Sequence, residues 1–314
     1  MARVPTWVML CLPVAFLGPR TPQAASEACI PRDWEVEVRL DSGQLSSKTM
    51  LAAAEALNAT GFAVLRGSIF SEKDLDEAQA VAEAELERVK DAAARLNLLG
   101  RAPWLRGSYS AGKLFEFQEA LCYSEGRLDM PGLLEHPLLS AWRGHPGLRG
   151  VAERCFGRGC EQTVLGALWN FPGSGPPVWH RDGDADLLVA VTAARDYPEA
   201  VGFIHGQPKS HRIASNSAAP PNPELGEVDV PLPLRRGDTL LFYYSTKHAA
   251  TPNLSNLDRC LLYGVYGPQG TRDHHYQQKK QLIWMFSTVV RATLPHGQVF
   301  SLSRSCPPCR PWQP

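Results

Sequence analysis

The sequence lacks a net charge and lacks any apolar run long enough to cross a bilayer. Its 314 residues include 32 Lys and Arg and 32 Asp and Glu, which gives a formal net charge of +0 at pH 7. A balanced chain offers no basic field for nucleic acid or for an acidic membrane surface. We therefore expect no nucleic-acid partner and no membrane span, and the charge names no polymeric ligand.

The paired cysteine spacing of a zinc ribbon is also missing. Of the eight cysteines, only Cys306 and Cys309 form a CxxC motif (CPPC), and they lie in a Pro-rich tail outside any βαβ pattern. This context favours a local disulfide, or no role at all, over a redox centre.

The N-terminus has the order of a secretory signal. Arg3 precedes an apolar run that ends at Leu17, and small residues follow from 24 to 28. The run is too short to span a bilayer, and Pro5 and Pro13 interrupt it. We expect cleavage near residues 25–28 and a location in the secretory pathway or outside the cell. The alternative is an apolar N-terminus of a cytoplasmic protein.

The N-terminal half reads as a strand followed by helices. The stretch 61–65 (GFAVL) predicts a short buried strand, and Ser71 is the expected N-cap of a helix that continues to about residue 98. Apolar residues recur along this helix at 3- and 4-residue spacing and predict a stripe packed on the core: Leu75, Ala78, Ala82, Leu86 and Val89. A second helix is expected over 137–156, with His136 and His145 as surface or capping residues.

From residue 163 onward the sequence pattern changes to short apolar runs separated by turn residues. The runs are 163–169, 186–192, 202–204, 228–231, 239–244 and 260–266. Short strands at close spacing are typical of a sandwich or barrel. We predict an α+β fold with a mainly β core, in which a β-barrel is buttressed by N-terminal helices and encloses a concave interior.

A histidine and an aspartate stand two residues apart just after a Pro/Gly-rich run. If the stretch 179–183 (WHRDG) is a strand, the side chains of His180 and Asp182 leave it on the same face. His248 lies 68 residues beyond His180, at the end of a predicted strand. Two imidazoles and one carboxylate on one face are the facial triad of non-haem Fe(II) oxygenases. We therefore predict that these three residues bind iron.

Arg259 follows 11 residues after His248 and opens the strand 260–266. A guanidinium that faces a barrel interior pairs with a carboxylate in bidentate fashion. A keto-acid that chelates iron at one end and carries a carboxylate at the other would fit between His248 and Arg259. The alternative for Arg259 is a surface ion pair with a neighbour such as Asp258.

These motifs together resemble the phytanoyl-CoA dioxygenase family of Fe(II)/2-oxoglutarate oxygenases. The resemblance runs from about residue 60 to 268 and keeps the family's order of elements. Its pieces are 61–67 (GFAVLRG) with the helix after it, 179–182 (WHRD), 202–211 (GFIHGQPKSH), 236–238 (RGD) and 248–259 (HAATPNLSNLDR). The stretch 110–117 (SAGKLFEF) resembles a segment in which some members use a lysine, here Lys113, to contact the keto-acid.

The resemblance implies a double-stranded β-helix (jelly-roll, cupin-like) domain over 60–295. It follows the predicted signal (1–28) and an N-terminal extension (29–59), and precedes a Pro- and Cys-containing tail (296–314). The implied activity uses Fe(II), O2 and 2-oxoglutarate, and allows ascorbate as an additional reductant. It would hydroxylate a small-molecule or lipid-like substrate with release of succinate and CO2, and the loops around 101–135 and 205–230 would choose that substrate.

Two departures from the family pattern matter. The family's Pro-Gly-Ser-His becomes Pro208-Lys209-Ser210-His211, so the turn or its contacts should differ, and we expect His211 to organise that turn. Some members place a hydroxyl residue two after the distal histidine, where this chain has Ala250, so the grip on 2-oxoglutarate should rest more on Arg259.

Other readings remain open. A halogenase of the same fold typically has a small residue in place of the carboxylate ligand, and Asp182 argues against it. A prolyl-hydroxylase-like enzyme of the secretory pathway commonly has a lysine where Arg259 stands. A metal-binding or 2-oxoglutarate-sensing module without turnover would keep the same ligands.

Overall fold

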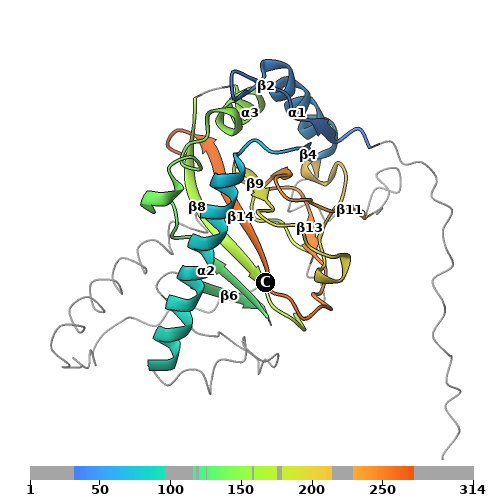
Figure 1. The fold of residues 1–314 in the computed structure, drawn as a ribbon. Coiled ribbons are helices and arrows are strands. Elements are labelled where there is room, and N and C mark those ends of the chain that lie inside the picture. Colours follow the sequence, from blue (N-terminus) through green and yellow to red (C-terminus); the bar gives the residue numbers. More distant parts are fainter. Residues whose placement is uncertain are drawn as a thin grey trace, which may run out of the picture. The chain divides into compact units, whose positions relative to one another are not determined.

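The computed structural model describes residues 32–95, 116–117, 120–124, 126–157, 159–174, 179–213 and 229–271. All described residues from Asp33 onward belong to one unit, Asp33–Pro314 (Figure 1). The strands are β1 (Glu35–Glu37), β2 (Leu40–Asp41), β3 (Gln44–Leu45), β4 (Phe62–Arg66), β5 (Glu116–Phe117), β6 (Ala120–Ser124), β7 (Arg127–Met130), β8 (Cys160–Asn170), β9 (Leu188–Thr192), β10 (Ile204–Gly206), β11 (Val230–Leu232), β12 (Thr239–Tyr243), β13 (His248–Ala250) and β14 (Arg259–Pro268). The helices are α1 (Ser47–Thr60), α2 (Glu72–Arg95) and α3 (Pro146–Phe156), with short 3-10 turns η2 (Pro137–Leu139), η3 (Glu199–Val201) and η4 (Ser210–Arg212).

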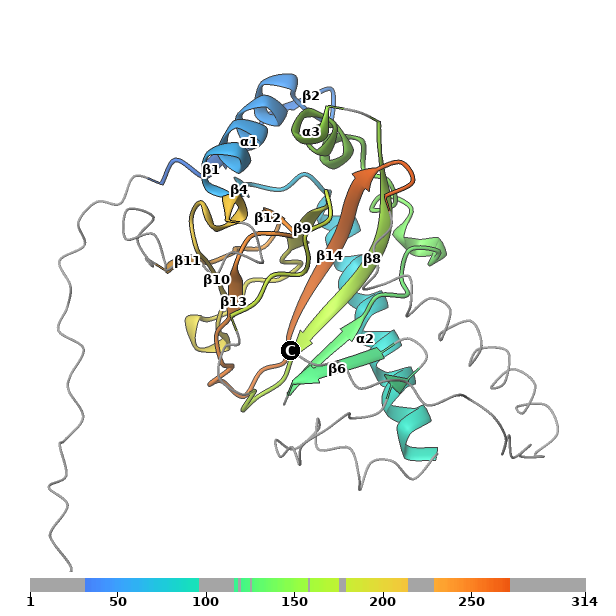
Figure 2. The same ribbon diagram turned by 180° about the vertical axis from the view of Figure 1, so that it is seen from behind.

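Two sheets form the β core. The large sheet has the order β1-β4-β12-β9-β14-β8-β7-β6-β5, and the small sheet has the order β11-β10-β13. Figure 2 shows the small sheet standing beside the large one. Ile204, Val230 and Leu232 of the small sheet share one apolar cluster with strands β4, β9, β12 and β14 of the large sheet, so this core lies between the sheets. This is the predicted double-stranded β-helix.

The helices cover the other face of the large sheet, as α2 does in Figure 1. The predicted stripe of α2 is buried there, and its five residues are at most 4% exposed. Ser71 caps this helix through a hydrogen bond from the Asp74 N–H to its hydroxyl (3.1 Å). The strand predicted over 61–65 is β4, and its residues alternate between the two cores, which explains why its sequence reads as one continuous apolar run.

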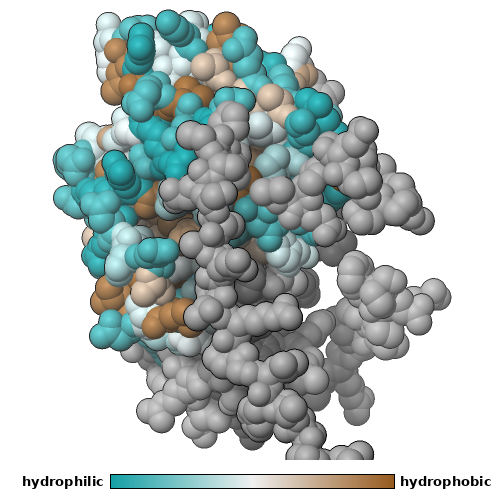
Figure 3. Space-filling view, turned by 90° about the vertical axis from the view of Figure 1, so that its right-hand side faces the viewer, coloured by the Kyte–Doolittle hydropathy of each residue, from teal (hydrophilic) through white to brown (hydrophobic). Residues whose placement is uncertain are grey.

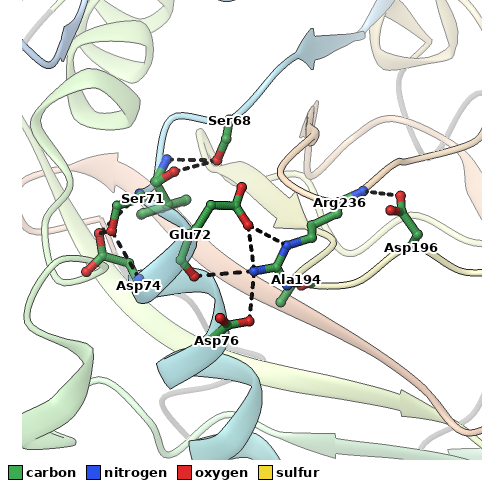
Figure 4. Close-up of polar contacts among 9 residues, drawn as sticks. Ser68, Ser71, Glu72, Asp74, Asp76, Ala194, Asp196 and Arg236 are labelled. Carbon is green, nitrogen blue, oxygen red and sulfur yellow. Dashed lines mark hydrogen bonds and ion pairs between the residues drawn. The ribbon is translucent and has the colours of Figure 1, made fainter.

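Arg236 ties the start of α2 to the sheet (Figure 4). Its guanidinium pairs with Glu72 (2.9 Å) and Asp76 (2.8 Å) and donates to the carbonyl of Ala194. These ion pairs raise the pKa of Arg236, and together the contacts fix the helix over the turn that leads into β12.

The same turn anchors β4. The Asp238 carboxylate accepts from the Gly67 N–H (2.9 Å) and from Arg66 Nη1 (2.7 Å). Gly237 has φ +86°, and a Cβ there would lie 2.7 Å from Cβ of Ser68, so only glycine fits. The predicted Arg-Gly-Asp stretch before β12 is thus a structural joint between neighbouring strands.

Two expectations about chain regions need correction. The helix expected over 137–156 is two pieces, η2 and α3, because Gly144 has φ +58° and His145 begins a new helix as its N-cap. The region around 101–135, expected to be loop, contains β5, β6 and β7, which extend the large sheet. Within the N-terminal extension, the structure places β1–β3 and most of α1, and β1 pairs in parallel with β4.

Within the described ranges, no helix is both long and apolar enough to cross a membrane. On the face shown in Figure 3, hydrophobic residues of the described part are scattered among hydrophilic ones. The predicted signal, the CPPC motif and Lys113 lie outside the described residues.

Candidate metal and keto-acid site

The three predicted ligands come together. The Nε2 atoms of His180 and His248 lie 3.5 and 3.9 Å from Oδ1 of Asp182. One ligand atom from each residue can be chosen so that all three lie within 4.8 Å of one another. Two imidazole nitrogens and a carboxylate oxygen at this spacing form a donor set that suits a divalent first-row metal.

The backbone places these ligands. His180 and His248 form an antiparallel bridge, and Asp182 donates its N–H to the carbonyl of Tyr244 (3.0 Å). Arg181, between the two first ligands, donates to the carbonyls of Ser210 (3.0 Å) and Ile213 (2.9 Å). The segment 180–182 is therefore held on both sides.

His248 is oriented as a metal ligand. Its Nδ1 lies 3.0 Å from the carbonyl of Thr246, which as an acceptor fixes the proton on Nδ1 and leaves the Nε2 lone pair facing Asp182. Its ring packs on Phe242 at a centroid distance of 4.5 Å. Burial lowers the pKa of His248, which keeps the imidazole in the neutral form that a metal requires.

Arg259 is buried on the inner face of the large sheet. Along β14, Leu261, Tyr263 and Val265 point into the core between the sheets, and Arg259 has the same parity. It is 2% exposed, and its Nε and Nη1 have no hydrogen-bond partner among the described residues. Burial, followed by the charge of Arg127, lowers its pKa to about 10.

This placement decides between the two readings of Arg259. A guanidinium that is 2% exposed cannot be part of a surface ion pair with Asp258. A buried cation whose donors are unsatisfied costs free energy unless an anion binds to it. Arg259 is thus the one predicted cosubstrate residue that the structure describes, and it has the burial and the open donors that an anion site needs.

Asn253 and Ser255, the N-x-S of the sequence, position Arg259. The Asn253 amide is fully buried and donates to the carbonyls of Asn170 (2.9 Å) and Leu257 (2.7 Å). Its Oδ1 accepts from the N–H (3.0 Å) and hydroxyl (2.7 Å) of Ser255. These bonds hold the loop between β13 and β14, and hence the start of β14, against the end of β8.

The turn at 208–211 contains a left-handed residue that is not glycine. Lys209 has φ +64°, in the left-handed region, and its N–H donates to the carbonyl of Thr60 (2.6 Å). The lysine therefore occupies a backbone conformation that glycine adopts more readily. His211 packs on Tyr243 at a centroid distance of 5.4 Å and is not part of the described metal-ligand group, in line with its expected role in the turn.

Two inner-face residues were missed from the sequence. Arg127 of β7 and Asn170 of β8 are register partners, and Asn170 is in turn the partner of Arg259. The three side chains therefore leave adjacent strands on the same face, at the same level. The only sequence signal for Arg127 was the alternation of polar and apolar residues in 127–130 (RLDM).

No family model and no curated protein sequence matches this chain. Solved structures do. The non-heme alpha ketoglutarate dependent carbocyclase SnoK of nogalamycin biosynthesis is 20% identical, with a TM-score of 0.52 over 76% of this chain and 92% of SnoK. The epimerase SnoN, solved with Fe3+, alpha ketoglutarate and nogalamycin RO, is 17% identical, with a TM-score of 0.54 over 84% of this chain and 97% of SnoN.

AviO1 from Streptomyces viridochromogenes Tue57 is 17% identical, with a TM-score of 0.51 over 72% of this chain and 98% of AviO1. At these identities the likeness defines the fold. The chain therefore has the fold of non-haem iron, 2-oxoglutarate-dependent enzymes. This conclusion does not depend on the residues at its site.

Proposed function

We propose that the protein is an Fe(II)- and 2-oxoglutarate-dependent oxygenase of the phytanoyl-CoA dioxygenase-like kind. It hydroxylates a small-molecule or lipid-like substrate and releases succinate and CO2. The observation that carries the proposal is the burial of Arg259, with open donors, on the inner face of a fold that also brings His180, Asp182 and His248 together. A metal site and an anion site in one barrel fit a keto-acid that is a ligand at one end and a carboxylate at the other.

The chain's own residues divide the work. His180, Asp182 and His248 would hold iron on one face and leave its remaining positions for the keto-acid and O2. Arg259 would bind the far carboxylate and so fix the direction in which the keto-acid lies. Bound iron supplies the O2 activation that couples decarboxylation of the keto-acid to oxidation of a substrate C–H bond.

The solved neighbours support this chemistry and leave its outcome to be established. SnoN and SnoK are described as an alpha ketoglutarate dependent epimerase and carbocyclase. Asp182 keeps the carboxylate ligand, which supports oxygen transfer over halogenation. Hydroxylation is thus our proposal for the fate of the substrate, and entry into the secretory pathway is our proposal for the place.

The test is release of succinate from 2-oxoglutarate by protein loaded anaerobically with Fe(II) and then exposed to O2, with ascorbate, across a panel of small-molecule and lipid-like substrates. Turnover should be lost in Asp182→Asn and retained in Asp184→Asn, a matched change at an exposed carboxylate two residues away. Iron-loaded wild type that neither binds nor consumes 2-oxoglutarate would refute the proposal and leave a metal-binding module.

A further inference from the structure

We infer that Arg127 is a second guanidinium of the keto-acid site, which together with Arg259 binds the far carboxylate and selects dicarboxylic keto-acids. This inference rests on the proposed function and names a residue that no sequence motif assigned.

The first support is position. Arg127, Asn170 and Arg259 stand at one level on the neighbouring strands β7, β8 and β14, because Asn170 is the register partner of both arginines. Their side chains share the face that lines the core between the sheets. The two guanidinium groups therefore flank a single strand on the side of the barrel where the metal ligands lie.

The second support is a direct link to the metal-bearing strand. Arg127 Nη2 donates to the carbonyl of Ala250 (2.6 Å), two residues beyond His248 in β13. Asn170 Nδ2 lies 3.4 Å from the carbonyl of the next residue, Thr251. One end of the Arg127 fork is thus anchored on the strand that carries a metal ligand, and this orients the guanidinium across the gap between the sheets.

The third support is charge. Burial lowers the pKa of Arg127, and the charge of Arg127 in turn lowers the pKa of Arg259, so the two cations are close enough to repel each other. The carboxylate on the same face of β7, Asp129, accepts a hydrogen bond from the hydroxyl of Tyr263 (2.6 Å). A bound carboxylate between the two arginines would offset their repulsion and satisfy Nε and Nη1 of Arg259.

The position of Ala250 fits this assignment. Some relatives in the family that the sequence resembles place a hydroxyl residue there to hold the keto-acid, and this chain has none. Here the backbone carbonyl of the same residue holds Arg127 instead. Arg127, a charged donor from β7, would then replace part of the keto-acid binding that the hydroxyl provides in those relatives.

The experiment compares two keto-acids of the same chain length, 2-oxoglutarate and 2-oxopentanoate, which has a methyl group in place of the far carboxylate. Binding to Ni(II)-loaded full-length protein is measured by calorimetry in the absence of turnover. Arg127→Met should weaken 2-oxoglutarate roughly 10- to 100-fold, as expected for loss of a charge-assisted contact. It should leave 2-oxopentanoate within about twofold, since that ligand never used the contact.

Arg127→Lys keeps the charge and a donor for Ala250 but loses the fork, so it should recover part of the 2-oxoglutarate affinity. It also keeps the test decisive if Arg127→Met does not fold, since Arg127→Lys alone should still weaken 2-oxoglutarate selectively. Arg195→Met is the control, because Arg195 is half-exposed and paired with Glu83 (2.6 Å), and it should change neither affinity.

A 2-oxoglutarate affinity in the Arg127 variants equal to that of the wild type would overturn the inference. So would an equal loss for both keto-acids, which would make Arg127 a structural support of β13 through Ala250. Wild-type protein that binds Ni(II) and neither keto-acid would instead refute the proposed function, and with it this inference.

Discussion

His180 and His248 exchange both of their backbone hydrogen bonds, N–H to carbonyl, at 3.0 and 2.9 Å. Two ligands that are 68 residues apart in the sequence are therefore placed opposite each other by the backbone, before any metal binds. Their rings follow, with centroids 4.4 Å apart. A preformed ligand pair lowers the ordering cost of metal binding.

The first prediction concerns metal binding. The His180 side chain is 48% exposed, so His180→Ala should fold normally and yet lose one-to-one binding of Co(II) or Fe(II). Calorimetry and metal analysis after gel filtration measure this, with circular dichroism to check the fold. His136→Ala, which removes the cap of η2, should bind metal as the wild type does. Undiminished binding in His180→Ala would rule out the triad.

The second prediction sets stability against binding. Arg259→Met keeps an unbranched apolar side chain and removes a buried, unsatisfied cation, so the free energy of unfolding of the keto-acid-free protein should rise by about 1–3 kcal/mol. The same variant should raise the KM for 2-oxoglutarate at least about tenfold. Urea unfolding and initial rates provide the two numbers. A variant that is less stable and binds 2-oxoglutarate normally would show that Arg259 is structural.

The third prediction concerns the loop before β14. Asn253→Ala leaves the buried Asn170 carbonyl without its partner and removes the bonds to the Leu257 carbonyl and the Ser255 hydroxyl, which should lower the free energy of unfolding by about 1–3 kcal/mol. Because this loop sets the position of Arg259, 2-oxoglutarate affinity should fall as well. Asn256→Ala removes an exposed amide three residues later and is the matched control. A stability change no larger than that of the control would contradict the assigned role.

The fourth prediction is a pH dependence. His145 caps α3 through Nδ1, which accepts from the Leu148 N–H (3.4 Å), and burial lowers its pKa below the usual value of about 6.5. The unfolded chain then binds the proton more readily than the folded one, so this contribution to stability is present above about pH 6.5 and is lost as the pH falls below it.

Urea unfolding between pH 7.5 and 5.5 measures this effect. His145→Asn keeps a capping acceptor without the titration and should make stability less dependent on pH in that window. His248, whose pKa is also lowered, contributes with the same sign in both proteins, so the comparison isolates His145. The same pH profile in wild type and variant would contradict the prediction.

The sequence predicted those site residues that can be recognised by residue type. It failed to predict strands whose polar site residues interrupt the hydrophobic pattern. The runs around β8, β9, β12 and β14 were predicted because strands buried on both faces are continuously apolar. The strand β7 was missed because Arg127 and Asp129 replace apolar residues on its inner face. Polar site residues on the inner face of a barrel thus interrupt the apolar pattern by which their strand would be predicted.

Short elements were lost for a different reason. The strand β13 has three residues, His248–Ala250, and its backbone pairs with β10 and with His180, which lie far away in the sequence. No local pattern can predict such a strand. The placement of Arg127 at the same level as Arg259 also depends on pairing between distant strands, since each arginine is the register partner of Asn170. Lys113, the other residue predicted to contact the keto-acid, stays a prediction.

The last prediction concerns Lys209, in the turn at 208–211. Lys209 adopts the left-handed conformation, which is unfavourable for a residue with a Cβ. The turn nevertheless keeps this shape, because the Lys209 N–H bonds to Thr60 and the Ser210 hydroxyl accepts from the Lys247 N–H (2.8 Å), next to His248. Local strain is thus maintained by contacts that support a metal ligand.

Lys209→Gly should relieve this strain and raise the free energy of unfolding by about 0.5–1 kcal/mol, the gain being reduced by the greater freedom of glycine in the unfolded chain. Lys209→Ala removes the same charge but keeps the Cβ, so it should give no such gain. Both variants should bind metal as the wild type does, because the backbone bonds to Thr60 and Lys247 remain. Urea unfolding of the three proteins decides the question, and a glycine variant less stable than the alanine variant would mean that the lysine side chain itself stabilises the turn.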